Sequence, residues 1–208
     1  ELKDLAGLKE LDTIFFIADT EKQAALFAGQ IRTELGNRLD LLEKNAYRFC
    51  YINDFPMFEY NVEEKKIGFT HNPFSMPQGG LEALNEKDPL EILAYQYDIV
   101  CNGVELSSGA VRNHDMQIME KAFEIAGYDK SVLEEKFGAL YNAFQFGAPP
   151  HAGMAPGVDR MIMLLRNEEN IREVIPFPMS GTAQDLMCGA PNEVTEQQLR
   201  EVHIKVRQ

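Results

Sequence analysis

The sequence is poor in cysteine, contains no long apolar run and has few basic residues for its acidic content. The three cysteines, Cys50, Cys101 and Cys188, are odd in number and far apart, with no C-x-x-C pair. This usage favours reduced thiols in a cytoplasmic protein and excludes a disulfide scaffold. No stretch approaches the roughly 18 uncharged apolar residues of a transmembrane helix. The opening ELKDLAGLKELD is charged and is no signal peptide, and because no initiator Met precedes it, we expect a fragment boundary there.

Charge and composition exclude further classes of protein. Lys and Arg total 20 against 33 Asp and Glu, a formal charge of −13. A field of that sign repels phosphate backbones, so we expect no nucleic-acid binding by this segment unaided, although a local basic cleft stays open. With 45% hydrophobic and 25% charged residues over 208 positions, the chain reads as globular, either one large domain or one domain plus part of another. It carries no Walker motif, no G-x-S-x-G, no Cys/His zinc spacing and no dinucleotide fingerprint.

The first quarter of the chain predicts a strand and a helix. The apolar run at 13–18 is typical of a buried strand. Thr20 with Gln23 three residues later matches a capping box, which predicts a helix that ends at Gly36-Asn37. The predicted helix buries four apolar side chains at helical spacing: Leu26, Phe27, Ile31 and Leu35.

The middle of the chain is dominated by strand signals. Residues 47–54 are β-rich, and a hairpin is predicted from 57–61 and 66–72 around a charged turn. Residues 75–90 are rich in Pro and Gly, which predicts loop with one short helical turn. The strongest strand signal spans 97–112, where Asn-Gly separates two β-rich runs and favours a two-residue hairpin turn.

The last part of the chain alternates helices with loops. Helices are predicted over 115–126, from a capping box at Ser131, and over 158–167 after the Gly/Pro-rich run 147–157, with a final helix capped at Thr195. The helix from Ser131 is expected to bury five side chains: Leu133, Phe137, Leu140, Tyr141 and Phe144. Because the strands connect mainly through hairpins, the pattern predicts an α+β fold, an antiparallel sheet flanked by helices.

Two carboxylates on the strongest hairpin form a candidate site. If Asn102-Gly103 is the turn, Val100 pairs with Glu105 and Asp98 with Ser107, which places Asp98 and Glu105 diagonally on one face. Carboxylates about 7–8 Å apart at Cβ suit a divalent cation that bridges phosphate oxygens. Spacing alone favours the alternative, a solvated face with two unrelated acids. A wider loop with the register slipped by one would instead put the acids on opposite faces.

Three further positions have weaker signals of their own. A bulge within the small residues 107–109 would turn Arg112 onto the acid-bearing face, where it could grip a carboxylate; otherwise it is an exposed strand-end Arg. His71, in FTHNPF, could donate to an anionic substrate or lie on the surface of a turn. Gly157 opens an apolar helix and would let a ligand approach the backbone, with Arg160 able to stack on a flat ring.

Several ordered stretches resemble bacterial-type aspartyl-tRNA synthetases, a family of class II aminoacyl-tRNA synthetases. The stretches are IFFIAD, DFPMFEY, THNPFSMP, YDIVCNGVEL, GAPPHAGMAPGVDRMIMLL and the closing DLMCGAP. The resemblance implies part of a class II catalytic-domain fold. It also implies an aspartate–tRNA ligase as parent enzyme, which activates L-aspartate with ATP to aspartyl-adenylate and passes the aminoacyl group to tRNA. The implied cofactors are ATP and Mg²⁺, and the parent is expected to be a homodimer without membrane attachment.

The resemblance also implies roles for individual residues. His71 and Arg112 would bind the substrate aspartate, with Arg112 on its side-chain carboxylate, and Asp98 and Glu105 would hold magnesium. GAPPHAGMAPGVDR is similar to the third class II motif, in which Arg160 would stack on the adenine of ATP. The positions that would contact ATP are Glu105, Gly157, Val158, Asp159 and Arg160.

The sequence departs from the family pattern in three ways. The usual His-His is His71-Asn72 here, and the glycine-rich run after the Glu is reduced to one glycine at 106–110. The first and second class II motifs and the anticodon-binding OB domain are not found. We therefore expect this chain alone to be inactive, and a non-catalytic binding or scaffold module is the alternative to an enzyme. The resemblance divides the chain into the tail of an insertion domain (1–20), a connecting helix (21–46) and the C-terminal part of a catalytic domain (47–208).

Overall fold

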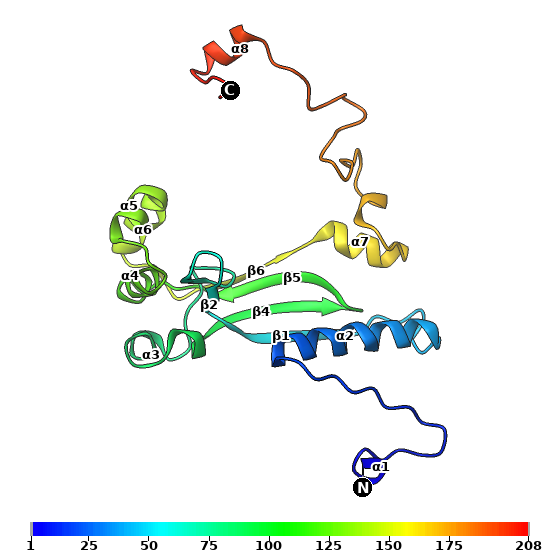
Figure 1. The fold of residues 1–208 in the computed structure, drawn as a ribbon. Coiled ribbons are helices and arrows are strands. Elements are labelled where there is room, and N and C mark those ends of the chain that lie inside the picture. The colour runs from blue at the N-terminus through cyan, green and yellow to red at the C-terminus, as the bar shows by residue number, and fades with distance from the viewer. Residues whose placement is uncertain (1, 208) are drawn as a thin grey trace. The chain divides into compact units, whose positions relative to one another are not determined.

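A computed structural model describes residues 2–207 and divides the chain into two compact units, Glu1–Tyr47 and Arg48–Gln208. Figure 1 shows the elements of both, and among the described residues no helix is both long and apolar enough to cross a bilayer.

The first unit consists of two helices, α1 (Leu2–Leu5) and α2 (Glu21–Arg38), joined by loop. The predicted strand at 13–18 is wrong: the segment has no regular secondary structure and is exposed except for the half-buried Ile17. A strand needs a neighbour for its backbone groups, and none of the strands in the described chain pairs with this run.

The helix predicted after Thr20 forms, but two of its details are wrong. Thr20 occupies the N-cap position without a side-chain cap hydrogen bond, so the capping box is absent. None of the helix residues is buried, and Leu26 and Phe27 are 53% and 42% exposed. The apolar spacing is real, but burial also requires a second packed surface, which the described residues of this unit do not supply.

The second unit contains the predicted α+β architecture. Its antiparallel four-stranded sheet has the order β1-β4-β5-β6, and β2 pairs with β3 in a separate hairpin. The strands are β1 (Phe49–Pro56), β2 (Phe58–Asn61), β3 (Lys66–Phe69), β4 (Leu93–Cys101), β5 (Val104–Val111) and β6 (Ala152–Pro156). The first five agree with the strand signals of the sequence. β6 is a correction, because Gly and Pro made 147–157 read as loop, whereas an edge strand tolerates proline.

Most helices of this unit gather at one end of the sheet, whereas the helix that directly follows β6 lies at the other end (Figure 1). They are α3 (Gly80–Glu86), η1 (Pro89–Glu91), α4 (Met116–Ile125), α5 (Lys130–Lys136), α6 (Gly138–Gln145), α7 (Val158–Arg166), η2 (Ile171–Glu173) and α8 (Glu196–Glu201). Helix α3 is longer than the single turn predicted in 75–90. The helix predicted from Ser131 is in fact two, interrupted at Phe137, and its N-cap is Asp129. Helix α8 has the predicted capping box at Thr195.

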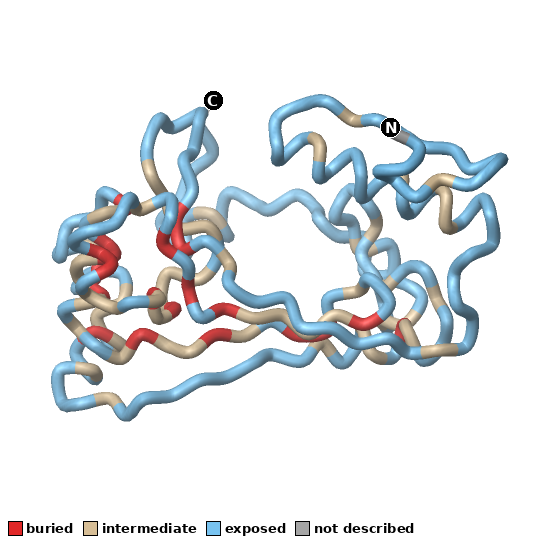
Figure 2. The backbone as a smooth tube through the Cα atoms, turned by 90° about the horizontal axis from the view of Figure 1, so that it is seen from below, coloured by how far each residue is buried: buried red, intermediate tan, exposed pale blue. Residues whose placement is uncertain are grey.

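The core of this unit consists of two clusters of buried side chains, coloured red in Figure 2. The first joins the hairpin and β4 to α3 and α4: Met57, Phe58, Leu84, Ile92, Ala94, Ala122 and Ala126. The second joins α4 to α5 and α6: Met119, Phe123, Leu133 and Tyr141. Of the five side chains expected to be buried here, Leu133 and Tyr141 are buried, and Phe137, Leu140 and Phe144 are half-buried.

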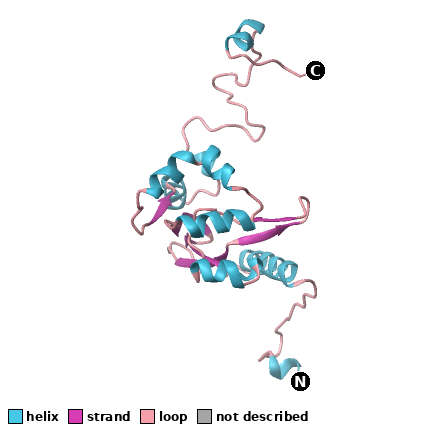
Figure 3. Cartoon of the chain, turned by 90° about the vertical axis from the view of Figure 1, so that its left-hand side faces the viewer, coloured by secondary structure: helices cyan, strands magenta, loops and turns pink. Residues whose placement is uncertain are grey.

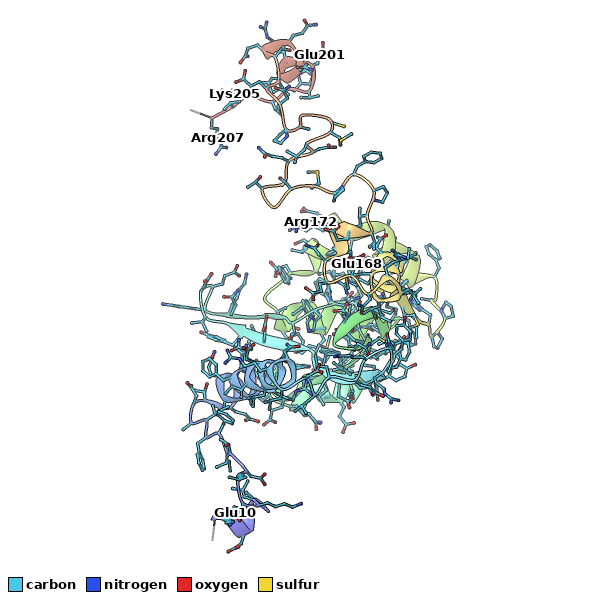
Figure 4. All side chains as sticks on the ribbon, turned by 90° about the vertical axis from the view of Figure 1, so that its right-hand side faces the viewer. Glu10, Glu168, Arg172, Glu201, Lys205 and Arg207 are labelled. Carbon is cyan, nitrogen blue, oxygen red and sulfur yellow. The ribbon has the colours of Figure 1, made fainter. Side chains whose placement is uncertain are left out.

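The chain after α7 is mostly loop until α8, as Figure 3 shows. Arg172 in η2 donates a hydrogen bond from Nε to the carbonyl oxygen of Met179 at 3.1 Å, which ties the start of this segment to η2 (Figure 4).

A buried hydroxyl links α4 to α6 and makes stability depend on pH. Tyr141 donates to Glu120 Oε1 at 2.5 Å, and this bond, with help from Lys130, lowers the pKa of the Glu120 carboxyl. Because the folded-state pKa is depressed, its stabilisation is present above the unfolded pKa and is lost as pH falls through the folded value.

We therefore expect Tyr141→Phe to lower the free energy of unfolding by about 1 kcal/mol at neutral pH. The difference from wild type should shrink as the pH falls from about 5 to about 3. Urea unfolding across this pH range measures both, with the exposed Tyr60→Phe as control. A difference that stays constant with pH would contradict the assigned role of Glu120.

Candidate active site

A cavity of about 270 Å³ lies over one face of the sheet at the β4–β5 hairpin. It brings together four residues singled out from the sequence, His71, Asp98, Glu105 and Arg112. The rest of its lining is Phe55, Asn72, Gln96, Ser108, Gly109 and Ala155. Acidic and basic side chains from separate strands therefore share one pocket.

The hairpin turn has the predicted register at its tip. Asn102 and Gly103 form the turn with φ of 50° and 81°, the positive values that a type I′ turn requires. Val100 lies opposite Glu105, as predicted. The slipped register, which would put the two acids on opposite faces, is wrong.

Beyond the tip, a bulge lies one residue earlier than predicted. Asp98 faces Ser108, not Ser107, because the register shifts between Ile99 and Val100 and leaves Leu106 as the extra residue. The predicted position within 107–109 is therefore wrong, but the predicted effect occurs. From Ser108 onward, even-numbered residues of β5 share the face of Asp98.

This phase change puts Arg112 on the side of the carboxylates. Its backbone is held on both sides, by the N–H bond to the His151 carbonyl at 2.9 Å and by a β-bridge to Ser75. Within residues 2–207, no side-chain hydrogen bond or ion pair engages its guanidinium. A half-buried, unpaired guanidinium fork in a pocket is suited to a carboxylate ligand.

The two carboxylates influence each other. Burial raises the pKa of the Asp98 carboxyl, the negative Glu105 raises it further, and His71 lowers it. A cation between the two acids would relieve their repulsion. The described residues contain no cluster of three or more metal-ligating side chains. A pair of carboxylates is nevertheless a donor set that suits Mg²⁺, which commonly takes one or two carboxylates and fills its shell with water and phosphate oxygens.

Helix α7 is joined to the same hairpin through the bulge. Leu106 accepts the Gly157 N–H at 2.7 Å, and a Cβ on Gly157 would lie 3.4 Å from that carbonyl oxygen. Arg160 Nη1 donates to the Glu105 backbone oxygen at 2.7 Å and to its Oε1 at 3.1 Å. Arg160 therefore lies next to the carboxylate pair. None of the four positions 157–160 lines the pocket itself, and the predicted ATP contacts of Gly157, Val158, Asp159 and Arg160 stay predictions.

Comparison with known proteins identifies the family to which the chain belongs. The family model of class II tRNA synthetases (D, K and N) matches residues 8–181. The chain belongs to this family. It is 62% identical over 205 residues to the aspartate–tRNA(Asp/Asn) ligase of Zymomonas mobilis and 56% identical over 206 residues to that of Ehrlichia canis. Each alignment covers 99% of the chain but only 34% and 35% of the relative, so the chain spans about a third of their length.

Among solved structures, the chain is similar to the aspartyl-tRNA synthetase from Entamoeba histolytica, with a TM-score of 0.49 and 23% identity. That alignment covers 88% of this chain and 30% of the other. A second is the asparaginyl-tRNA synthetase from Pyrococcus horikoshii, with a TM-score of 0.45, 18% identity and coverage of 64% and 27%.

In this class II chain, the position after His71 has a turn-forming role. The His71 ring meets the Phe55 ring edge-on, with centroids 5.2 Å apart. Asn72 Oδ1 accepts the Phe74 N–H at 2.9 Å, an Asx turn that shapes the loop along the pocket. The side chain that replaces a second imidazole therefore organises the backbone.

Sequence reasoning gave no site role to the other six lining residues, and two of them, Gln96 and Gly109, are tightly packed. Gln96 is 6% exposed and lies two residues before Asp98 on β4, so the parity that linked the two acids could have found it. No sequence signal indicates Gly109, because the need for a glycine at this position comes from neighbours that are distant in sequence. Tyr97 donates from its hydroxyl to the Gly153 carbonyl at 2.9 Å, and Gly109 lies against both.

This close packing predicts the effect of adding one methyl group. A Cβ on Gly109 would lie 2.5 Å from both the Gly153 oxygen and the Tyr97 ring, so the β6 backbone and the Tyr97 side chain would have to move. We expect Gly109→Ala to lower the free energy of unfolding by about 1–3 kcal/mol, measured by urea denaturation. Gly153→Ala is the matched control, since a Cβ there meets nothing within 4 Å. Equal stability of the two variants would contradict the close packing.

Proposed function

We propose that the complete protein of which this chain is a part is an aspartate–tRNA ligase. It would activate L-aspartate with ATP to aspartyl-adenylate and transfer the aminoacyl group to tRNA. The observation that carries the proposal is the unpaired Arg112 guanidinium in the same pocket as the Asp98–Glu105 pair. The guanidinium is complementary to a carboxylate ligand, and the neighbouring carboxylate pair is complementary to magnesium with its bound phosphates.

The proposed division of labour follows from charge and geometry. Arg112 binds the side-chain carboxylate of aspartate through paired N–H bonds and disfavours asparagine, whose amide NH₂ would face a second donor. His71 lies at the pocket wall, where it contacts the substrate amino acid. Catalysis then rests on positioning and charge neutralisation, with no covalent enzyme intermediate.

ATP would lie along the hairpin toward α7. Asp98 and Glu105 would hold Mg²⁺, which when bound would neutralise charge on the phosphates. Arg160, anchored to Glu105, offers its planar guanidinium to the adenine ring beside Gly157. Glu105 thereby connects the metal and nucleotide parts of the site.

The partner assignments extend the same proposal. Because the relatives are named for tRNA(Asp/Asn), we infer that the complete protein charges both tRNAs. Its proposed location is the cytoplasm, and its proposed assembly is a homodimer. We also propose residues 1–20 as the tail of an insertion domain, 21–46 as a connecting helix and 47–208 as the C-terminal part of the catalytic domain. The −13 charge of this chain favours tRNA contacts through other parts of the protein.

Amino-acid-dependent ATP–pyrophosphate exchange tests the activity. The complete protein should exchange pyrophosphate with aspartate and not with asparagine, while the 208-residue chain alone, in which two class II motifs are not found, should give none. Exchange by the chain alone would overturn the requirement for the missing motifs. No exchange by the complete protein would leave a non-catalytic binding module as the better interpretation.

A further inference from the structure

One of the neutral side chains that line the charged pocket is Gln96, which lies on β4 opposite Ala110. Its 6% exposure shows that the amide is enclosed by protein while the residue still lines the cavity. A buried amide needs hydrogen-bond partners, and their identity shows what it holds in place.

Both donors of this amide are used on one loop. Gln96 Nε2 donates to Ser75 Oγ at 2.8 Å and to the backbone oxygen of Asn72 at 3.3 Å. A backbone carbonyl can only accept, so the amide NH₂ must face Asn72 and the orientation of the amide is determined. The side chain therefore spans from β4 to the loop 71–75.

The same loop is tied to the strand that carries the substrate-binding arginine. Ser75 is completely buried and forms a β-bridge with Arg112, and the Met76 N–H donates to the Val111 carbonyl at 2.9 Å. These are backbone ties from β5. Gln96 adds a side-chain tie from β4, beneath the loop that bears His71.

We propose that Gln96 is a positioning residue for aspartate binding, whose amide NH₂ fixes the loop 71–75 over the pocket. This rests on the proposed ligase function and names a determinant of its amino-acid site. Gln96 acts through the loop: it holds His71 and the bridged Ser75 at a fixed position relative to Arg112. Without the amide, the backbone ties remain, including the bond from the Tyr95 N–H of β4 to the Met76 carbonyl at 2.9 Å, but Asn72 and Ser75 lose their side-chain anchor to β4.

Two substitutions distinguish the hydrogen bonds of the Gln96 amide from the space that its side chain fills. Gln96→Met keeps a flexible side chain of similar length and removes both donors, whereas Gln96→Glu also directs a carboxylate at the Asn72 carbonyl. In the complete protein, we expect the KM for aspartate in pyrophosphate exchange to rise about 10-fold for Met and more for Glu. The KM for ATP and kcat should stay within about threefold of wild type, because the groups proposed to contact ATP are unchanged.

The choice of KM distinguishes positioning from a structural defect. A variant that is partly unfolded loses Vmax for every substrate but keeps the KM of its folded fraction. Gln117→Met, on the exposed face of α4, is the matched control and should behave as wild type. If Gln96→Met does not fold, Ser75→Ala removes one partner of the amide and should raise the aspartate KM by a smaller factor.

The outcomes separate this inference from the function on which it rests. If the wild-type protein shows no aspartate-dependent exchange, the proposed function fails. If wild type is active and Gln96→Met and Gln96→Glu keep the wild-type aspartate KM, the positioning role of Gln96 is overturned. An equal rise in the KM for ATP would also overturn it, because the effect would then not be confined to the loop.

Discussion

Replacing Arg112 with lysine in the complete protein is expected to raise the KM for aspartate by about 10- to 100-fold. Lysine keeps the positive charge but removes the planar fork, which binds a carboxylate through two parallel hydrogen bonds. Since Arg112 has no side-chain partner within the described residues, the substitution breaks no ion pair of the folded chain. Its effect should therefore fall on the ligand, with little change in stability.

Steady-state pyrophosphate exchange at varied aspartate measures this effect. The KM for ATP should not change, because Arg112 lies on the amino-acid side of the carboxylate pair. Arg166→Lys, at the exposed end of α7, is the matched control. An unchanged aspartate KM in Arg112→Lys would place this arginine outside the amino-acid site.

The sequence predicted best where local chemistry decides the structure. The Asn102-Gly103 turn requires positive φ at both positions, which few other pairs tolerate, and this fixed the strand pairing at its tip. The capping box at Thr195, which begins α8, is again a local signal. The α+β class followed from the hairpin connections between strands.

Prediction failed where partners distant in sequence decide the structure. The apolar run 13–18 has strand-like composition but pairs with no strand of the described chain. Conversely, β6 has loop-like composition, and pairing with β5 along Ser107–Val111 makes it a strand. Composition alone carries neither fact, because a β-ladder is a property of two segments.

The candidate site shows the same division. The shared face of Asp98 and Glu105 follows from the turn and could be predicted, but the position of the bulge could not. Its extra residue, Leu106, gives its carbonyl to Gly157 at the start of α7, a contact between segments about fifty residues apart. The bulge therefore occurs where the start of α7 packs against β5. The small residues 107–109 do not indicate that contact.

Replacing Glu105 with glutamine is the corresponding test of the carboxylate pair. The variant keeps the Glu105 backbone oxygen, which accepts from Arg160 at 2.7 Å, and keeps a side-chain oxygen for the bond at 3.1 Å. The hydrogen-bond partners of Arg160 are therefore preserved, and what is lost is one negative charge, which acts on both Asp98 and the Arg160 guanidinium. Two carboxylates on one face are needed for the proposed magnesium site, so the loss should act on the metal-dependent step.

In the complete protein, we expect Glu105→Gln to lower kcat for pyrophosphate exchange by about 100-fold and to raise the magnesium concentration required for half-maximal rate. Glu124→Gln, which removes an exposed carboxylate of α4, is the control and should leave both values unchanged. A fall in rate with an unaltered magnesium requirement would contradict a shared metal site. Glu105 would then act through Arg160 and the nucleotide alone, because that contact is the other role the geometry gives it.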